Sequence, residues 1–265
     1  MKSKIFLDSG DPKETKEALN LLGFLDGQTT NPSLIAKNPK AQGKKFSEQE
    51  ISSFYKGVVT EISKLIPKGS VSVEVYADKD TSADKLLEQA REMFAWIPNA
   101  HIKLPITKTG LEAAKRCTKE GIRVNMTLCF SQGQAAAVYA ATFGAKKGDV
   151  FISPFVGRLD DKGLNGMDLI KNIIEMYKYG DGHVEVLSAS VRSLNHLLYS
   201  QALGCDIVTA PLKVLKEWKE NMNQLKPIDY REIDLNKPWQ DYDISHEMTD
   251  AGIKKFISDW TGLIK

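Results

Sequence analysis

Strand-like and helix-like segments alternate along this chain, and the alternation limits its fold more than any other feature. Eight short runs rich in β-branched and apolar residues predict strands at Lys4–Asp8, Phe24–Thr29, Val71–Tyr76, Ala100–Leu104, Ile122–Thr127, Asp149–Ser153, Val184–Ala189 and Asp206–Thr209. Segments of helical period lie between them, among them Pro12–Leu22, Glu50–Leu65, Ser82–Phe94, Thr109–Thr118, Ser131–Phe143, Gly166–Tyr179 and Ser193–Leu203. Strands joined by crossover helices run parallel. Eight such units in 265 residues therefore predict a single-domain α/β fold, the (β/α)8 TIM barrel.

An open, doubly wound sheet is the alternative fold. The chain contains neither G-x-G-x-x-G nor G-x-x-x-x-G-K-[ST], so a nucleotide site of the Rossmann or P-loop type is disfavoured.

Two polar segments interrupt the alternation without dividing the chain into domains. Residues 38–49 are rich in Lys and Gln and predict a loop before the helix at Glu50, and residues 217–245 predict a surface excursion. The helical period returns near residues 249–261, with Ile253, Phe256 and Trp260 on one face. Such a face needs a partner, which the sequence leaves open between the chain's own barrel and a neighbouring subunit.

Composition excludes several classes of function. Lys and Arg number 36 and Asp and Glu 34, so the net charge of +2 gives no electrostatic basis for binding nucleic acid or a membrane surface. Cys117, Cys129 and Cys205 lack the spacing of a disulfide framework or zinc site. The first residues do not resemble a signal peptide, and no run reaches the ~18 apolar residues of a spanning helix. We therefore expect a cytoplasmic protein.

Polar side chains occur at or near the carboxyl ends of six predicted strands, where the reactive groups of such barrels gather. The seven residues are Asp8, Asn31, Glu74, Lys103, Asn125, Thr127 and Ser153. Each is costly to bury unless it is paired. They could form a satisfied polar network without chemistry, but so many at the same ends favour an active site.

Lys103 is the sharpest signal among them, because it lies between apolar Ile102 and Leu104. Its structural interpretation is a side chain that extends its amine to solvent, or a buried ion pair, for example with Glu74. Its functional interpretation is an amine that forms a Schiff base with a ketone, since desolvation disfavours the ammonium form. Such chemistry needs proton transfer, which Asp8, Glu74 and Thr127 could supply.

Two arginines follow the sixth and seventh predicted strands and are candidates for binding phosphate. Arg158 lies after the sixth strand and Arg192 after the seventh, where Ser190 or Ser193 is placed to cap a helix. Arginine together with free N–H groups at a helix start binds phosphate well. A Schiff-base lysine beside a phosphate site predicts a phosphorylated ketose substrate. Surface ion pairs are the alternative role for both arginines.

The remaining candidates carry less weight. The four histidines lack metal-ligand spacing, so no metal is assigned, and His101 is interpreted as structural. Cys129 is interpreted as a packed thiol near the site.

The chain resembles the transaldolase and fructose-6-phosphate aldolase family at these same residues. The matching stretches are Phe6-Leu7-Asp8, Thr29-Thr30-Asn31-Pro32-Ser33-Leu34, Val73-Glu74-Val75, Ile102-Lys103-Leu104-Pro105, Asn125-Met126-Thr127-Leu128, Phe130-Ser131 with Gln134-Ala135, Ser153-Pro154-Phe155-Val156-Gly157-Arg158 and Ser188-Ala189-Ser190-Val191-Arg192. The resemblance implies a circularly permuted (β/α)8 barrel of the class I aldolase type, without a cofactor. It also implies sugar phosphates as small-molecule partners and a homo-oligomer.

The same resemblance implies a role for each site residue. Lys103 would form the Schiff base, Asp8 would be the acid and base at the carbon–carbon bond, and Glu74 and Thr127 would hold a proton-relaying water. The implied substrate-binding residues are Asn31, Asn125, Ser153, Phe155, Arg158, Ser190 and Arg192. The implied reaction transfers a dihydroxyacetone unit from sedoheptulose 7-phosphate or fructose 6-phosphate to glyceraldehyde 3-phosphate or erythrose 4-phosphate, in the non-oxidative pentose phosphate pathway.

The family divides into transferases and aldolases. The aldolase branch tends to carry Gln at the position of Glu74 and Tyr at that of Phe155, so these two residues favour the transferase. An aldolase that releases free dihydroxyacetone, and a silent sugar-phosphate-binding barrel, are the alternatives. Residues 38–49 and 217–245 look like insertions relative to compact members.

Overall fold

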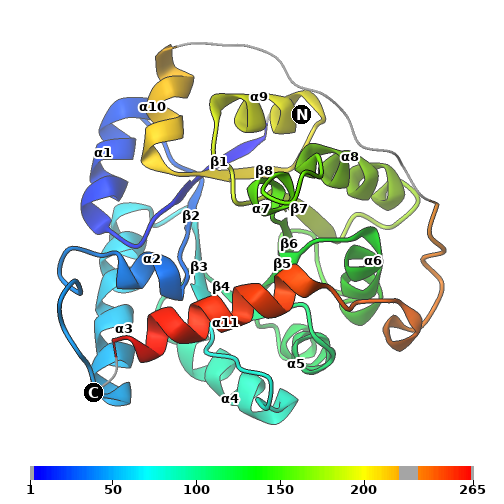
Figure 1. Cartoon of the computed structure of the whole chain (residues 1–265), viewed down its shortest axis with the longest axis horizontal. Coiled ribbons are helices and arrows are strands. Elements are labelled where there is room, and N and C mark those ends of the chain that lie inside the picture. Colours follow the sequence, from blue (N-terminus) through cyan, green and yellow to red (C-terminus); the bar gives the residue numbers. More distant parts are fainter. Residues whose placement is uncertain (1–2, 221–231, 264–265) are drawn as a thin grey trace.

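Eight parallel strands close into a barrel in this computed structural model, which describes residues 3–220 and 232–263 (Figure 1). Each strand pairs with the next along the chain, and β8 pairs with β1. The strands are β1 Lys4–Asp8, β2 Gly27–Thr29, β3 Ser70–Glu74, β4 Ala100–Pro105, β5 Val124–Cys129, β6 Val150–Pro154, β7 Val184–Ser188 and β8 Ile207–Ala210. The predicted barrel is confirmed, and the alternative of an open sheet is wrong.

Helices surround the barrel and connect its strands. They are α1 Pro12–Leu22, α2 Pro32–Ala36, α3 Glu48–Leu65, α4 Ala83–Phe94, α5 Lys108–Lys119, α6 Gln132–Ala141, α7 Val156–Asp160, α8 Gly166–Tyr177, α9 Leu194–Ala202, α10 Leu212–Glu220 and α11 Glu247–Thr261, with a 3₁₀ turn η1 at Trp239–Asp241. Side-chain caps fix many of their starts. Ser47 and Glu50 form a capping box, so α3 begins at Glu48, two positions before the predicted start.

The sequence analysis missed three helices, α2, α7 and α10. Two of them are five residues long, too short to show a period. The prediction that residues 217–245 form one surface excursion is wrong at its start, and two side chains within it are not at the surface. Residues 217–220 continue the amphipathic α10, and Trp239 and Tyr242 are buried. Residues 221–231 lie outside the described residues.

Helix α11 lies across the carboxyl-end mouth of the chain's own barrel (Figure 1). Its buried residues include Ile253, Phe256 and Trp260, the apolar face identified in the sequence. Near its start, Thr249 Oγ1 donates a hydrogen bond to the carbonyl oxygen of Leu128 at the end of β5 (2.8 Å). The partner of the apolar face, left open by the sequence, is therefore the barrel of the same chain.

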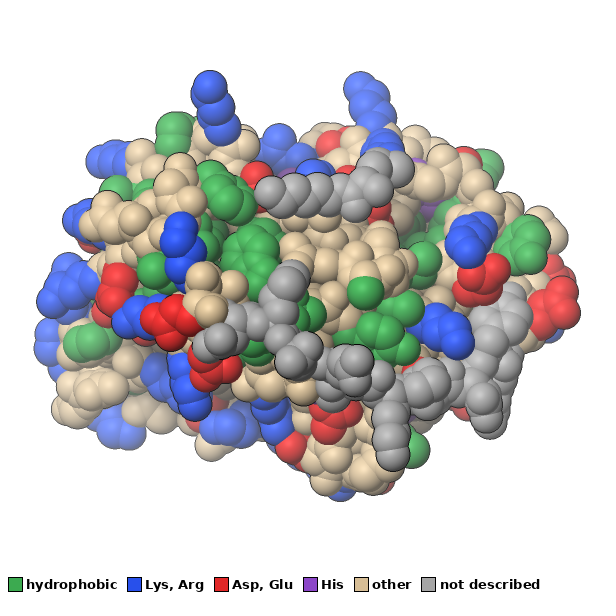
Figure 2. Space-filling model, turned by 90° about the horizontal axis from the view of Figure 1, so that it is seen from above, with side chains coloured by type: hydrophobic (Ala, Val, Ile, Leu, Met, Phe, Trp, Pro, Cys, Tyr) green, Lys and Arg blue, Asp and Glu red, His purple; other side chains and the backbone are tan. Residues whose placement is uncertain are grey.

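Positive and negative side chains are mixed on the face of the molecule shown in Figure 2. Figure 2 shows Lys and Arg side chains interspersed with Asp and Glu side chains over one face. In the described part of the chain, we find no helix with the length and apolar character needed to cross a membrane.

Candidate active site

Three of the predicted site residues are neighbours in the register of the sheet. Glu74 of β3 pairs with Lys103 of β4, and Lys103 pairs with Asn125 of β5. Register partners in a parallel sheet point to the same face, so these side chains share one level of the barrel interior. Ile102 and Leu104 alternate with Lys103 and are fully buried on the other face, toward the helices.

Lys103 lies inside the barrel and is only 3% exposed. Its Nζ is 2.9 Å from Glu74 Oε2 and donates a hydrogen bond to the carbonyl oxygen of Thr30 at 3.2 Å. The buried ion pair considered from the sequence is thus present. Pairing offsets the desolvation of both charges, which is why a lysine is tolerated among apolar strand residues.

Two carboxyl groups flank this amine, and the pKa of each is shifted upward. Burial raises the pKa of Asp8 and of Glu74, while the positive charge of Lys103 opposes the rise in both. Thr29 Oγ1 donates a hydrogen bond of 2.6 Å to Asp8 Oδ1, which holds that carboxylate in place. Carboxyl groups with raised pKa values are suited to exchanging protons near neutral pH.

Asn125, Ser153 and Thr127 lie next to this group. Ser153 Oγ donates to Asn125 Oδ1 (2.6 Å), and Asn125 Nδ2 donates to Ser72 Oγ (3.0 Å), so the amide is engaged with protein groups. Thr127 Oγ1 is buried, and within residues 3–220 and 232–263 it has no hydrogen-bond partner. A buried hydroxyl in this condition requires a partner, which a water or a substrate would supply.

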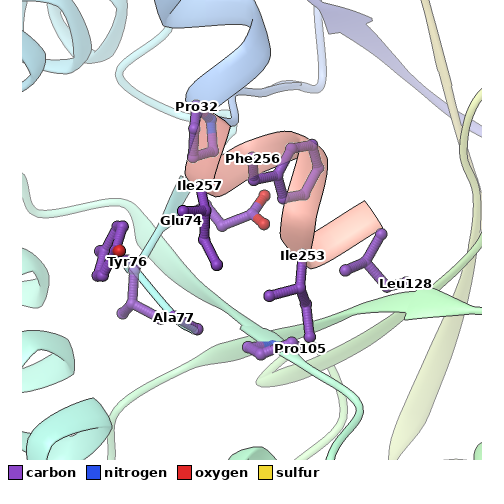
Figure 3. A pocket seen from close by; sticks show the side chains of 10 residues that line it. Pro32, Glu74, Tyr76, Ala77, Pro105, Leu128, Ile253, Phe256 and Ile257 are labelled. Carbon is purple, nitrogen blue, oxygen red and sulfur yellow. The ribbon is translucent and has the colours of Figure 1, made fainter. Parts of the chain in front are cut away.

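A cavity of about 220 Å³ opens above Lys103. Eight of the predicted residues line it: Asp8, Asn31, Lys103, Ser153, Phe155, Arg158, Ser190 and Arg192. Glu74, Asn125 and Thr127 do not line it. Glu74 instead borders a smaller cavity under α11, where its carboxylate points into the space between Ile253, Phe256 and Ile257 (Figure 3).

The two arginines lie on the rim of the larger cavity and have different environments. Arg192 makes a two-pronged ion pair with Asp161 that includes an Nη2–Oδ2 contact of 2.6 Å. Arg158 is mostly buried, with its guanidinium over the ring of Phe155 at 4.9 Å. The carbonyl oxygen of Ser190 accepts a hydrogen bond from Gly157 N–H (3.1 Å), which joins the segments that carry the two arginines.

The loop before α9 has an unusual conformation at Ser190, whose φ of 57° lies in the left-handed region. Ser193, rather than Ser190, caps α9, because its Oγ accepts the N–H of His196 (3.2 Å). Ser190, the second serine considered as a cap, does not cap α9 and instead lines the cavity.

The sequence analysis missed several residues that border the larger cavity, namely Thr29, Ser33, Leu34, Lys37, Ala189, Thr209 and Phe256. Thr29 and Ser33 flank Asn31, so their place in that stretch could have identified them. Lys37 lies on an exposed helix end and Phe256 on a distant apolar face, and neither has a local signal.

Tyr55 of α3 supports the site and was also missed. Its buried hydroxyl accepts a hydrogen bond from the N–H of Glu74 (2.9 Å) and lies 2.6 Å from Thr30 Oγ1. It therefore links the strand that carries Glu74 to the loop whose carbonyl receives Lys103 Nζ.

We expect Tyr55→Phe to lower the free energy of unfolding by about 1–3 kcal/mol, because it removes the oxygen that accepts the buried N–H of Glu74. Urea denaturation followed by circular dichroism measures the change. Tyr179→Phe is the matched control, since Tyr179 is 80% exposed and should show no change. Equal stabilities of the two variants would show that the Tyr55 hydroxyl is not a structural link.

His101 and Cys129, the weaker candidates from the sequence, are packed among protein groups. His101 stacks on Phe151 with ring centroids 4.0 Å apart, and its ring nitrogens contact Ser70 Oγ and the carbonyl oxygen of Gly148. Burial raises the pKa of the Cys129 thiol to about 12. Among the described residues, no group of three or more His, Cys, Asp or Glu could hold a metal ion.

Several known proteins are similar to this chain. The sequence model of the family "Transaldolase/Fructose-6-phosphate aldolase" matches residues 5–265. A "Probable transaldolase" of Dehalococcoides mccartyi is 38% identical over 99% of this chain and 100% of its own length, and one of Brucella ovis is 40% identical over 97% of this chain and 96% of its own. The solved thiamine phosphate pyrophosphorylase of Pyrococcus furiosus overlays with a TM-score of 0.48 at 12% identity, over 82% of this chain and 94% of that one. The chain belongs to the transaldolase/fructose-6-phosphate aldolase family.

Proposed function

We propose that this protein is a transaldolase that moves a dihydroxyacetone unit from fructose 6-phosphate or sedoheptulose 7-phosphate to an aldose phosphate such as erythrose 4-phosphate or glyceraldehyde 3-phosphate. Its place would be the non-oxidative pentose phosphate pathway. The observation that carries the proposal is the buried Lys103, which is paired with Glu74 and lines a cavity that two arginines also line. An amine, two carboxyl groups and a phosphate-binding rim are the groups that this reaction needs.

The first chemical step is condensation of the amine with the ketone. Lys103 Nζ, after passing a proton to Glu74, attacks C2 of the ketose phosphate and forms a carbinolamine. Loss of water then gives the iminium ion. Glu74 on β3 and Thr127 on β5 lie on the two strands that flank β4, the strand of Lys103, and together they would hold a water that carries these protons.

Asp8 acts at the carbon–carbon bond. Its carboxylate accepts the proton of the C4 hydroxyl, the C3–C4 electron pair moves into the iminium, and the aldose phosphate leaves. The enamine that remains on Lys103 attacks the aldehyde of the acceptor, and Asp8 returns the proton to the new hydroxyl. Addition of water to the resulting iminium releases the new ketose phosphate and the free lysine.

The other cavity residues bind the rest of the sugar. Arg158 and Arg192, with Ser190 from the same loop as Arg192, would hold the phosphate, since charge-assisted contacts with guanidinium groups suit a phosphate dianion. Asn31, Ser153 and Phe155 border the space between Lys103 and the arginines and would contact the carbon chain. Asn125 would act through the Ser153 hydroxyl that it orients.

A coupled assay tests transfer against release. Enzyme with fructose 6-phosphate and erythrose 4-phosphate should form sedoheptulose 7-phosphate much faster than enzyme with fructose 6-phosphate alone forms free dihydroxyacetone. Release at a rate that rivals transfer would instead identify an aldolase, and binding without either reaction would identify a silent barrel.

We expect Arg192→Ala to raise the KM for fructose 6-phosphate by about 10- to 100-fold, because it removes a charged hydrogen-bond donor from the phosphate. The kcat should change much less. Arg91→Ala is the matched control, since Arg91 makes a similar two-pronged pair with Glu120 on the outer surface. An equal loss of activity with unphosphorylated dihydroxyacetone as donor would contradict this role for Arg192.

A further inference from the structure

We propose that α11 positions Arg158 for the phosphate through two of its residues, Phe256 and Gly252, and so sets the preference of the site for phosphorylated sugars. Both are positioning residues that act through Arg158. The inference rests on the proposed function, because it assigns a cause to the phosphate selectivity of that same cavity.

Phe256 covers the guanidinium of Arg158. The guanidinium carbon lies 5.5 Å from the centroid of the Phe256 ring and 4.9 Å from that of Phe155. A guanidinium stacked on aromatic rings is held by its faces, which leaves the N–H donors at its edge for a ligand. In the described part of the chain no carboxylate lies within ion-pair distance of Arg158, whereas Arg192 is already paired with Asp161.

Gly252 makes room for the same side chain. It lies one turn before Phe256 on α11, and a Cβ atom placed there would be 2.5 Å from Arg158 Nη1 and 2.6 Å from Leu128 Cδ2. Glycine is a poor helix former, so a buried glycine inside α11 requires a reason. The close approach of the guanidinium supplies one. Gly57 of α3, by contrast, has nothing within 4 Å of the corresponding position.

Helix α11 is anchored along its length, which fixes both residues. Thr249 near its start bonds to the carbonyl oxygen of Leu128 and receives the amide of Gln134 (2.9 Å). Asp259 accepts a hydrogen bond from Ser33 of α2, and Lys45 Nζ donates to the carbonyl oxygen of Gly262 (2.6 Å). The ring of Phe256 is therefore a fixed wall of the cavity, and the guanidinium is clamped between the barrel and α11.

Four variants test the inference: Phe256→Leu, Phe256→Tyr, Gly252→Ala and the control Gly57→Ala. Phe256→Leu keeps an apolar side chain but removes the aromatic face, and Phe256→Tyr restores that face. Gly252→Ala pushes the end of the Arg158 side chain away without adding charge. Circular dichroism and thermal unfolding confirm that each variant is folded.

Each variant is assayed with two substrate pairs, fructose 6-phosphate with erythrose 4-phosphate, and dihydroxyacetone with unphosphorylated glyceraldehyde. We expect Phe256→Leu and Gly252→Ala to raise the KM for fructose 6-phosphate by about three- to tenfold. They should weaken competitive inhibition by inorganic phosphate by a similar factor and affect the unphosphorylated reaction much less. Phe256→Tyr should recover most of the loss seen in Phe256→Leu, and Gly57→Ala should match the wild type.

Two results would overturn the inference. One is an unchanged KM for fructose 6-phosphate and an unchanged phosphate inhibition constant in both Phe256→Leu and Gly252→Ala. The other is an equal loss with both substrate pairs, which would show that α11 acts on the reaction itself. Failure of the proposed function is distinguished by the wild type, which in that case would transfer nothing in either assay.

Discussion

Lys103→Ala should lower the rate of transfer by roughly 10⁴-fold or more, because it removes the buried amine that forms the covalent intermediate. The variant also leaves the Glu74 carboxylate buried without its cation. An uncompensated buried charge is costly, and burial already raises the pKa of Glu74, so we expect this group to take up a proton in the variant. A steady-state assay of sedoheptulose 7-phosphate formation measures the loss.

Two matched variants separate the loss of the amine from loss of the fold. Lys103→Arg keeps a cation beside Glu74 but cannot form a Schiff base, so it should be folded and equally inactive. Lys4 lies at the start of β1, where its Nζ is 3.0 Å from Glu185 Oε1. The Lys4→Ala variant loses this ion pair and should remain active. Substantial transfer by Lys103→Arg would refute the assignment of this residue.

Asp8→Asn is expected to reduce transfer by about 10²- to 10⁴-fold while making the protein more stable at neutral pH. The raised pKa of Asp8 means that the folded state binds this proton more tightly than the unfolded chain does. The stability from protonated Asp8 is fully present below the ordinary aspartate pKa and is lost as the pH rises through the raised value. An uncharged side chain removes that loss.

Thermal unfolding at two pH values and a pH–rate profile measure these effects. The Tm of Asp8→Asn should exceed that of the wild type by about 2 °C or more at pH 7, and the gain should disappear in acid. The acidic limb of wild-type transfer should lie above the ordinary aspartate range. Asp80→Asn, at a site that is 78% exposed, serves as the control. A lower Tm for Asp8→Asn than for the wild type at pH 7 would contradict this account of Asp8.

The fold and the centre of the site follow from short-range patterns. The alternation of strands and helices predicts the barrel because each unit has its own period and length. Lys103 was identifiable because a charged residue interrupts an apolar strand, and its pairing with Glu74 follows from parallel register. These patterns lie within one strand or between neighbouring strands, so they are visible in the sequence.

Contacts between distant segments could not be predicted in this way. Tyr55 looks like any apolar helix residue, and its bond to the N–H of Glu74 depends on how α3 packs against β3. The apolar pattern of α11, which includes Phe256, predicts that this face is buried but does not identify the surface that covers it. Similarly, nothing in the sequence shows that the amide of Asn125 is engaged by Ser72 and Ser153.

Trapping with borohydride tests the central claim most directly. Wild-type enzyme is incubated with fructose 6-phosphate, reduced with sodium borohydride, digested and analysed by mass spectrometry, with Lys103→Arg treated in parallel. The account predicts a stable adduct on the peptide that contains Lys103, dependent on the sugar and lacking in the variant. An unmodified Lys103, or an adduct of equal yield on other lysines, would contradict it.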